Sequence, residues 1–342
     1  MHAAVGPGGR DTAREYGREA ASIGGPSRQG QRPPRGLFPP LRPLVTGLQL
    51  LLVAVGLTLS SAAQARADRI TNASVPTTLS GAGVRDCRVY LPPSYSTSEA
   101  AARRYPVIVF LHGWPGAEGN WPGEGHAGET LDRLILEHRI PEVIGLFPDG
   151  TGVGHLGRSM WLDSRDHRSR LETFLAHDLV SWADRTFRTR RDPAHRGVIG
   201  LSDGATGAMN QVLRHPDVYG AVGAHSGVYR LTPDWSSGPL FGDEPEASLL
   251  REGYSPLIEL LGHATSLSRA TIYFDCGEAD ESIADNQALH ARMDSLHIVH
   301  EFHVYPGSHD WGYWSAHLEQ SLIAVTSRMW PDAETGHSLS RP

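Results

Sequence analysis

The sequence predicts an α/β protein in which a mostly parallel central sheet is covered by helices on both faces, forming a three-layer α/β/α sandwich. The first observation is that short apolar runs alternate with segments of helical periodicity from about residue 87 to residue 330. The second is the composition of the 342 residues, of which 39% are hydrophobic and 20% charged. This is enough apolar material for one large core.

The predicted strands are short and mostly apolar, as expected of strands that are buried on both faces. They span residues 87–91, 107–111, 143–147, 197–201, 221–224, 271–275 and 299–305. Helical periodicity is clearest at residues 129–138, 171–186, 205–215, 286–296 and 314–330, between the strands or after the last one. This spacing is typical of right-handed crossovers between parallel strands.

An apolar run over residues 44–59 stands out near the start of the sequence. Arg35 and Arg42 precede it, and the small-x-small patterns of residues 63–65 and 65–67 follow it, as at a signal-peptide cleavage site. We therefore predict a leader with a signal peptide over residues 1–67. The alternative is an uncleaved membrane anchor, but the run is shorter than the roughly 20 residues of a full span.

The remainder is predicted to form a single domain over residues 68–330, followed by a polar, disordered tail over residues 331–342. Residues 231–267 break the alternation of strands and helices with several Pro and Gly residues, and we interpret them as an insertion that shapes substrate access. Residues 1–67 hold 8 of the 31 basic and 3 of the 38 acidic residues, so the remainder has a net charge of −12, which argues against nucleic acid and anionic lipid as partners.

Cysteine usage excludes two kinds of stabilisation. Cys87 and Cys276 are the only cysteines in the sequence, too few for a disulfide framework or a cysteine zinc cluster. One disulfide is compatible with export. Two free thiols are favoured, because the two residues fall on predicted strands that the expected topology does not place side by side.

The segment Gly200-Leu201-Ser202-Asp203-Gly204 matches the pattern G-x-S-x-G between a predicted strand and a predicted helix. A strand that turns abruptly into a helix holds the serine in a strained conformation, and side chains at the glycine positions would collide with neighbouring backbone. Ser202 is therefore the predicted nucleophile. The helix N-terminus favours negative charge, so the Asp203 backbone N–H is a predicted oxyanion donor.

The carboxylate of Asp203 is unexpected, because it adds negative charge beside a site that must stabilise an anion. The sequence leaves open whether this side chain faces away from the nucleophile.

His309 is the predicted general base, because it lies in the loop between the last predicted strand and the last helix. His297, His300 and His303 lie in or beside that strand and are expected to be packed or solvent-facing instead.

Asp280 is the predicted acid, because it follows the preceding strand, where a carboxylate can orient the imidazole. Asp275 and Glu278 are its rivals, but Asp275 is expected to serve the turn made with Gly277.

The turn that begins at His112 follows an apolar strand, where a second oxyanion donor is expected. The backbone N–H of Trp114 is the first choice and that of Gly113 the alternative, while Pro115 has no N–H to donate. A plain Gly-rich turn without a catalytic role stays open. Trp161 and His155 lie in a long later connection and are candidates for lining the substrate pocket or for loop packing.

Together these residues resemble the esterase D and mycolyltransferase-like branch of the α/β-hydrolases, which also includes feruloyl, acetyl-xylan and siderophore esterases. The resemblance spans about residues 85–327 and rests on the segments 88–95, 105–113, 147–150, 200–204 and 309–314. It implies the α/β-hydrolase fold, with Ser202, Asp280 and His309 as catalytic triad and no cofactor or metal. Asp203 and Ala205 depart from the residues usual in this branch.

These observations predict a secreted or cell-envelope serine esterase that cleaves carboxylic esters, carbohydrate-linked or otherwise small, through an acyl-enzyme. No stable membrane insertion is expected after signal cleavage. One alternative is an acyltransferase that acts on cell-envelope sugars, which would use the same active site. The other is a non-catalytic binding protein on an esterase scaffold. The intact Ser, His and Asp argue against a binding protein.

Overall fold

The computed structural model describes residues 69–81 and 83–330. The predicted leader over residues 1–67 and the predicted tail over residues 331–342 lie outside the described residues. None of the helices within the described ranges is long and apolar enough to cross a membrane.

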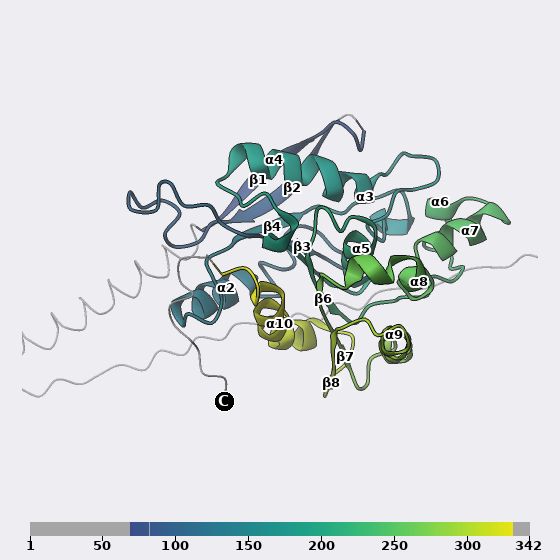
Figure 1. The fold of residues 1–342 in the computed structure, drawn as a ribbon. Helices are drawn as coiled ribbons and strands as arrows, with labels where there is room; N and C mark the ends of the chain where they lie inside the picture. Colours follow the sequence, from purple (N-terminus) through teal and green to yellow (C-terminus); the bar gives the residue numbers. More distant parts are fainter. Residues whose placement is uncertain (1–68, 82, 331–342) are drawn as a thin grey trace, which may run out of the picture. The chain divides into compact units, whose positions relative to one another are not determined.

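The described residues form an eight-stranded sheet with the order β1-β2-β4-β3-β5-β6-β7-β8 (Figure 1). The strands are β1 (Ile70–Thr77), β2 (Gly83–Tyr90), β3 (Val107–Leu111), β4 (Ile144–Pro148), β5 (Arg196–Leu201), β6 (Ala221–His225), β7 (Thr271–Gly277) and β8 (Glu301–Tyr305). Strands β3 to β8 are parallel to one another, β1 and β2 are paired antiparallel at one edge, and β2 pairs antiparallel with β4. The predicted mostly parallel sheet is confirmed.

The helices follow the strands in sequence. They are α2 (Ala127–Leu136), α3 (Leu171–Thr173), the π-helical segment η2 (Phe174–Leu179), α4 (Val180–Thr186), α5 (Asp203–Arg214), α6 (Gly238–Phe241), α7 (Glu246–Gly253), α8 (Pro256–Leu267), α9 (Ile283–Ser295) and α10 (Trp311–Thr326). Short 3₁₀ turns lie at His155–Gly157 and Pro193–His195.

Two apolar clusters bury the two faces of the sheet. One contains Leu131 of α2 and Leu318 of α10, packed with Ile108 and Phe110 of β3. The other contains residues of η2, α4, α5, α8 and α9, packed with the side chains that point to the opposite face. Helices therefore cover both faces of the sheet (Figure 1), which makes the domain the predicted α/β/α sandwich.

Strand β1 was not among the predicted strands. Its sequence, ITNASVPT, is largely polar, and most of its side chains are exposed or half-buried. An antiparallel edge strand needs only one covered face, so it lacks the apolar run that identifies a buried strand. Strand β2 likewise begins four residues before the predicted range, in a partly exposed segment.

The segment over residues 231–267 lies between β6 and β7 and contains α6, α7 and α8. Helix α8 begins with Pro256 in its first turn and packs against α5. Part of this segment therefore belongs to the helical layer over the sheet. The preceding part, around Asp234 and α6, lies near the loops described below.

Cys87 in β2 and Cys276 in β7 are both free and buried. Four strands separate β2 from β7 in the sheet, so the expectation of two free thiols is confirmed. Burial raises the pKa of each thiol to about 12, which keeps both groups protonated at neutral pH.

Candidate active site

Ser202 occupies a sharp turn between the end of β5 and the start of α5. Its backbone angles are φ 54° and ψ −124°, in a region that non-glycine residues rarely adopt. A Cβ atom at Gly200 would lie 2.0 Å from the carbonyl oxygen of Gly204, and one at Gly204 would lie 2.3 Å from the carbonyl oxygen of Leu111. Both glycines are required because backbone occupies the space of a side chain.

His309 and Asp280 extend a hydrogen-bonded chain from the serine. His309 Nε2 lies 2.9 Å from Ser202 Oγ, and His309 Nδ1 lies 3.0 Å from both carboxylate oxygens of Asp280. Asp280 also accepts from the backbone N–H of Ser282 at 2.8 Å and from its hydroxyl at 2.7 Å. Three loops that follow β5, β7 and β8 thus bring the three sequence-predicted residues together.

The pKa shifts of His309 and Asp280 suit a general base and the acid that orients it. Burial alone would lower the pKa of His309, but the hydrogen bond and the negative charge of Asp280 outweigh it, so the pKa is raised above its ordinary value. Burial alone would raise the pKa of Asp280, but hydrogen bonds from His309, Ser226 and Ser282 hold it well below its usual range. Asp280 therefore stays ionised and can stabilise an imidazolium.

The predicted oxyanion turn lies directly against the nucleophile. A Cβ atom on Gly113 would be 3.0 Å from Ser202 Cβ, so this backbone passes beside the serine. The Asp203 N–H heads α5, where the first N–H groups have no acceptor within the helix. The backbone N–H groups of Trp114 and Asp203 remain the candidates for polarising an ester carbonyl here.

His112 holds the Gly113 turn in place, a role that the sequence interpretation missed. Its Nε2 accepts from the Gly150 backbone N–H at 3.0 Å, so its Nδ1 carries the proton and donates to the Gly113 carbonyl at 2.7 Å. Burial lowers the pKa of His112, which keeps the ring in this neutral form. With the Gly113 carbonyl fixed, the trans peptide directs the Trp114 N–H to the opposite side.

Two buried indoles also fix the backbone before this turn. Trp161 Nε1 donates to the His112 carbonyl at 2.9 Å, and Trp121 Nε1 donates to the Leu111 carbonyl at 3.0 Å. Trp161 is only 2% exposed, and it fills the space beside Gly207 of α5. Between the two roles considered for Trp161, this burial favours packing beneath the turn over contact with a substrate.

The carboxylate of Asp203 is neutralised by an arginine that the sequence interpretation did not identify. Arg158 Nε and a terminal nitrogen of its guanidinium each lie 2.7 Å from one oxygen of Asp203, a bidentate pair that is mostly buried. Arg158 also contacts Asp234 at 3.2 Å and Ser236 at 2.5 Å. The elbow is thereby tied to the segment that precedes α6.

Three aromatic rings gather next to this ion pair. The rings of Trp114 and Trp235 lie 6.3 Å and 4.5 Å from that of His155, and the Arg158 guanidinium lies 4.9 Å from the Trp114 ring. His155 is exposed, and Trp235 is 74% exposed. We call Trp114, His155 and Trp235 the aromatic group. The sequence interpretation included His155 as a pocket candidate but did not include Trp235.

Asp275 and Glu278, the two alternatives to Asp280, do not contact His309. The expected turn role of Asp275 is wrong: its side chain is fully buried, and it accepts from the hydroxyls of Tyr273 at 2.8 Å and Tyr313 at 2.9 Å. Asp275 also lies 3.0 Å from Nδ1 of the buried His225. Glu278 is exposed, and neither carboxylate is bonded to His309.

The sheet order, the elbow after β5 and the Ser202–His309–Asp280 geometry together define the α/β-hydrolase class. Residues 83–325 match the esterase family described as "Putative esterase", and the chain belongs to this family.

Three relatives illustrate the similarity. An uncharacterised protein of Corynebacterium glutamicum is 28% identical over 263 residues, which cover 73% of this chain and 58% of that protein. An endo-1,4-beta-xylanase/feruloyl esterase of Xylanibacter ruminicola is 30% identical over 149 residues, 42% of this chain and 20% of that protein. A solved structure of a ferulic acid esterase has a TM-score of 0.68 and 26% identity, and the match covers 76% of this chain and 98% of that one. The chain thus spans 58% or less of the length of these two curated relatives.

Proposed function

We propose that this chain is an exported serine esterase that hydrolyses carboxylic esters by ping-pong acyl transfer. Ser202 Oγ attacks the ester carbonyl while His309 Nε2 takes its proton, and the protonated His309 returns that proton to the departing alcohol. Water then attacks the acyl-enzyme with His309 again as base, releasing the acid and restoring Ser202. The observation that carries this proposal is the 2.9 Å contact between His309 Nε2 and Ser202 Oγ, with Asp280 on the other ring nitrogen.

The same geometry supports a role for the two backbone N–H groups. Charge develops on the carbonyl oxygen during attack, and we propose that the Asp203 N–H at the start of α5 and the Trp114 N–H, next to Gly113, donate to that oxygen. The bidentate Arg158 partner removes the conflict that a free Asp203 carboxylate would create at this point.

For the substrate, we propose an ester with an aromatic acyl group, including esters linked to carbohydrate. The rings of the aromatic group contact one another edge to face, next to the turn that passes the serine, and an exposed Trp235 can stack on a flat acyl ring or on a sugar face. The ferulic acid esterase and the xylanase/feruloyl esterase among the relatives are consistent with this class. The predicted signal peptide supports export to where such esters occur.

A panel of soluble esters tests this function directly. Methyl ferulate, methyl benzoate, p-nitrophenyl acetate and p-nitrophenyl octanoate would each be incubated with the wild-type protein and with Ser202→Ala. We expect turnover of the panel with the highest kcat/KM for an aromatic acyl group, and no turnover above background with Ser202→Ala. Hydrolysis that survives in Ser202→Ala would overturn the mechanism, and equal kcat/KM for octanoate and ferulate would overturn the substrate class.

The same assay separates hydrolysis from acyl transfer. With added trehalose, a hydrolase releases the free acid at an unchanged rate, whereas an acyltransferase diverts the acyl group to the sugar. We expect free acid as the product in both conditions. Acyl-trehalose as the main product would show that a sugar hydroxyl, and not water, is the acyl acceptor.

A further inference from the structure

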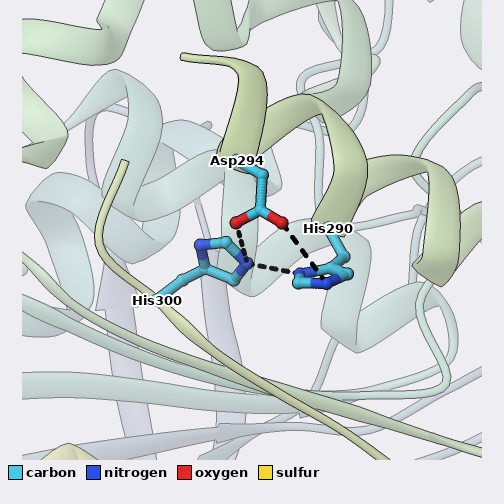
Figure 2. Close-up of side chains that lie close together, drawn as sticks. All are labelled: His290, Asp294 and His300. Carbon is cyan, nitrogen blue, oxygen red and sulfur yellow. Dashed lines mark hydrogen bonds and ion pairs between the residues drawn. The ribbon is translucent and has the colours of Figure 1, made fainter. Parts of the chain in front are cut away.

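Two histidines and an aspartate meet at the end of β8 that is opposite to the candidate active site. His290 and Asp294 are four residues apart on the last turns of α9, and His300 directly precedes β8 (Figure 2). Their ligand atoms all lie within 4.8 Å of one another. His309 follows the other end of the same strand, so this cluster does not share residues with the Ser202 site.

The hydrogen bonding of His300 leaves the correct nitrogen free for a metal. Its Nδ1 lies 2.7 Å from the carbonyl oxygen of Ile298, and because a carbonyl only accepts, Nδ1 must carry the proton. The lone pair of the neutral ring is therefore on Nε2, which faces His290 and Asp294. A backbone carbonyl on the second ring nitrogen is the usual means by which proteins orient a metal-binding histidine.

The distances between the donor atoms fit a small transition-metal ion. Zn–N bonds of about 2.0–2.1 Å at tetrahedral angles place neighbouring ligands about 3.4 Å apart. His300 Nε2 lies 2.7 Å from His290 Nδ1 and 4.0 Å from Asp294 Oδ1, and one ligand atom from each of the three residues lies within 4.8 Å of the others. The side chains of His290 and Asp294 are 41% and 63% exposed, so they can rotate to even out these distances.

Without a metal, a hydrogen bond joins His290 Nδ1 and His300 Nε2. With Nδ1–H of His300 committed to Ile298, the 2.7 Å contact requires His290 Nδ1 to donate to His300 Nε2. When a metal binds His290 Nδ1, that proton moves to His290 Nε2 or to solvent. Metal binding at this cluster is therefore coupled to the movement of a proton.

The location is electrostatically favourable for a cation. The C-terminal end of a helix carries a partial negative charge, and Asp294 adds a full one at the same end of α9. The His300 side chain is 4% exposed and stacks on Phe274 of β7 at 5.6 Å, so one ligand is held rigidly by the core. An ion here would link the end of α9 to the start of β8.

We propose that His290, Asp294 and His300 bind one divalent transition-metal ion, of the class of Zn²⁺, Co²⁺ and Ni²⁺. Two imidazoles and one carboxylate suit these ions rather than Ca²⁺ or Mg²⁺, which prefer oxygen ligands. The site is stabilising and takes no part in ester hydrolysis, because it joins α9 and β8 at the ends remote from Asp280 and His309.

The test uses the tag-free protein, freed of metal with a chelator and titrated with Zn²⁺ and with Co²⁺. We expect one ion per chain at this site, a visible absorption band with Co²⁺, and a Tm higher by about 5 °C when Zn²⁺ exceeds its Kd a hundredfold. His290→Gln and Asp294→Asn should each weaken binding by roughly 100-fold or more and remove the Tm shift. The His290 side chain is 41% exposed and that of Asp294 is 63% exposed, so these variants should fold as the parent does.

His297→Ala is the matched control, since His297 is an exposed histidine of the same connection. It should bind Zn²⁺ as the wild type does. Ester hydrolysis by the metal-free protein and by both ligand variants should be unchanged, which separates this site from the Ser202 chemistry. The proposal is overturned if the wild type and Asp294→Asn bind Co²⁺ with the same affinity and spectrum. It is overturned equally if Zn²⁺ leaves the wild-type Tm unchanged.

Discussion

Arg158 donates two hydrogen bonds of 2.7 Å to the carboxylate of Asp203, the residue that follows the candidate nucleophile. The pair is largely buried, with 14% of the arginine side chain and 6% of the aspartate side chain exposed. The arginine guanidinium also lies over Trp114, whose backbone N–H is a candidate oxyanion donor. One side chain thus neutralises the Asp203 carboxylate and contacts side chains of both residues whose N–H groups are the candidate oxyanion donors.

The first prediction concerns the loss of this arginine. Arg158→Met leaves a buried carboxylate without its partner, which should lower the free energy of unfolding by about 3 kcal/mol. The uncompensated charge also disfavours the developing oxyanion, so kcat should fall by roughly 10-fold to 100-fold. Urea denaturation and steady-state hydrolysis of p-nitrophenyl acetate measure the two effects.

The double variant Arg158→Met with Asp203→Asn is the control for that prediction. It removes both charges, so it should be more stable and more active than Arg158→Met alone. If the double variant is no better than the single one, then the arginine acts through some other contact than Asp203.

The second prediction tests the elbow. Gly204→Ala should abolish most activity and destabilise the domain, because its Cβ would lie 2.3 Å from the carbonyl oxygen of Leu111. Gly262→Ala in α8 is the matched control, since its Cβ would meet nothing within 4 Å. Alanine there should stabilise the domain by about 0.8 kcal/mol through helix propensity. Thermal unfolding of both variants checks these opposite signs, and equal effects would contradict the geometry.

The third prediction is the pH profile of kcat/KM. Only the neutral imidazole of His309 can accept the serine proton, so activity falls as pH drops through its pKa. Because Asp280 raises that pKa, the midpoint of the acid limb should lie above the ordinary histidine value of about 6.5. In Asp280→Asn the raising charge is gone and burial, which lowers the pKa, remains, so the midpoint should move to lower pH.

That substitution should also reduce kcat by on the order of 10³-fold or more, because the imidazole loses its orienting acid. Glu278→Gln is the control, since Glu278 is the nearby rival carboxylate and is exposed. It should leave the profile and the rate nearly unchanged. An acid limb that stays in place in Asp280→Asn would exclude Asp280 as the partner of His309.

The fourth prediction addresses the aromatic group. Trp235→Ala should raise KM for methyl ferulate by roughly 10-fold, because a stacked aromatic pair contributes about 0.5–1.5 kcal/mol beyond the area that it buries. The KM for p-nitrophenyl acetate and the kcat for both esters should change little. Leu261→Ala is an exposed control on α8 that should alter neither. A parallel loss for acetate and ferulate would show that Trp235 only supports the fold.

The elements that the sequence predicted are those with strong local signals. The buried parallel strands, the elbow at Ser202 and the loops of Asp280 and His309 follow from apolar runs, glycine spacing and chain order. These features depend on residues that are close in sequence. Strand β1 was not predicted, because an exposed edge strand needs no apolar run.

The supporting contacts depend on residues that are distant in sequence. Arg158 lies 45 positions from Asp203, and nothing in the local pattern around it indicates an ion pair with the residue after the nucleophile. His112 was visible only as part of a Gly-rich turn, since its acceptor role depends on the Gly150 N–H. Pro256 at the start of α8 is a helix-start signal within residues 231–267, which the sequence analysis interpreted as an insertion from the Pro and Gly residues before it.

Labelling by a fluorophosphonate probe is the most direct test of the central claim that Ser202, activated by His309, is the nucleophile. Peptide mass spectrometry of the wild-type protein should locate one stoichiometric phosphonyl adduct on Ser202, with labelling absent in Ser202→Ala and strongly slowed in folded His309→Ala. An adduct on a different residue, or wild-type labelling rates in His309→Ala, would contradict the account.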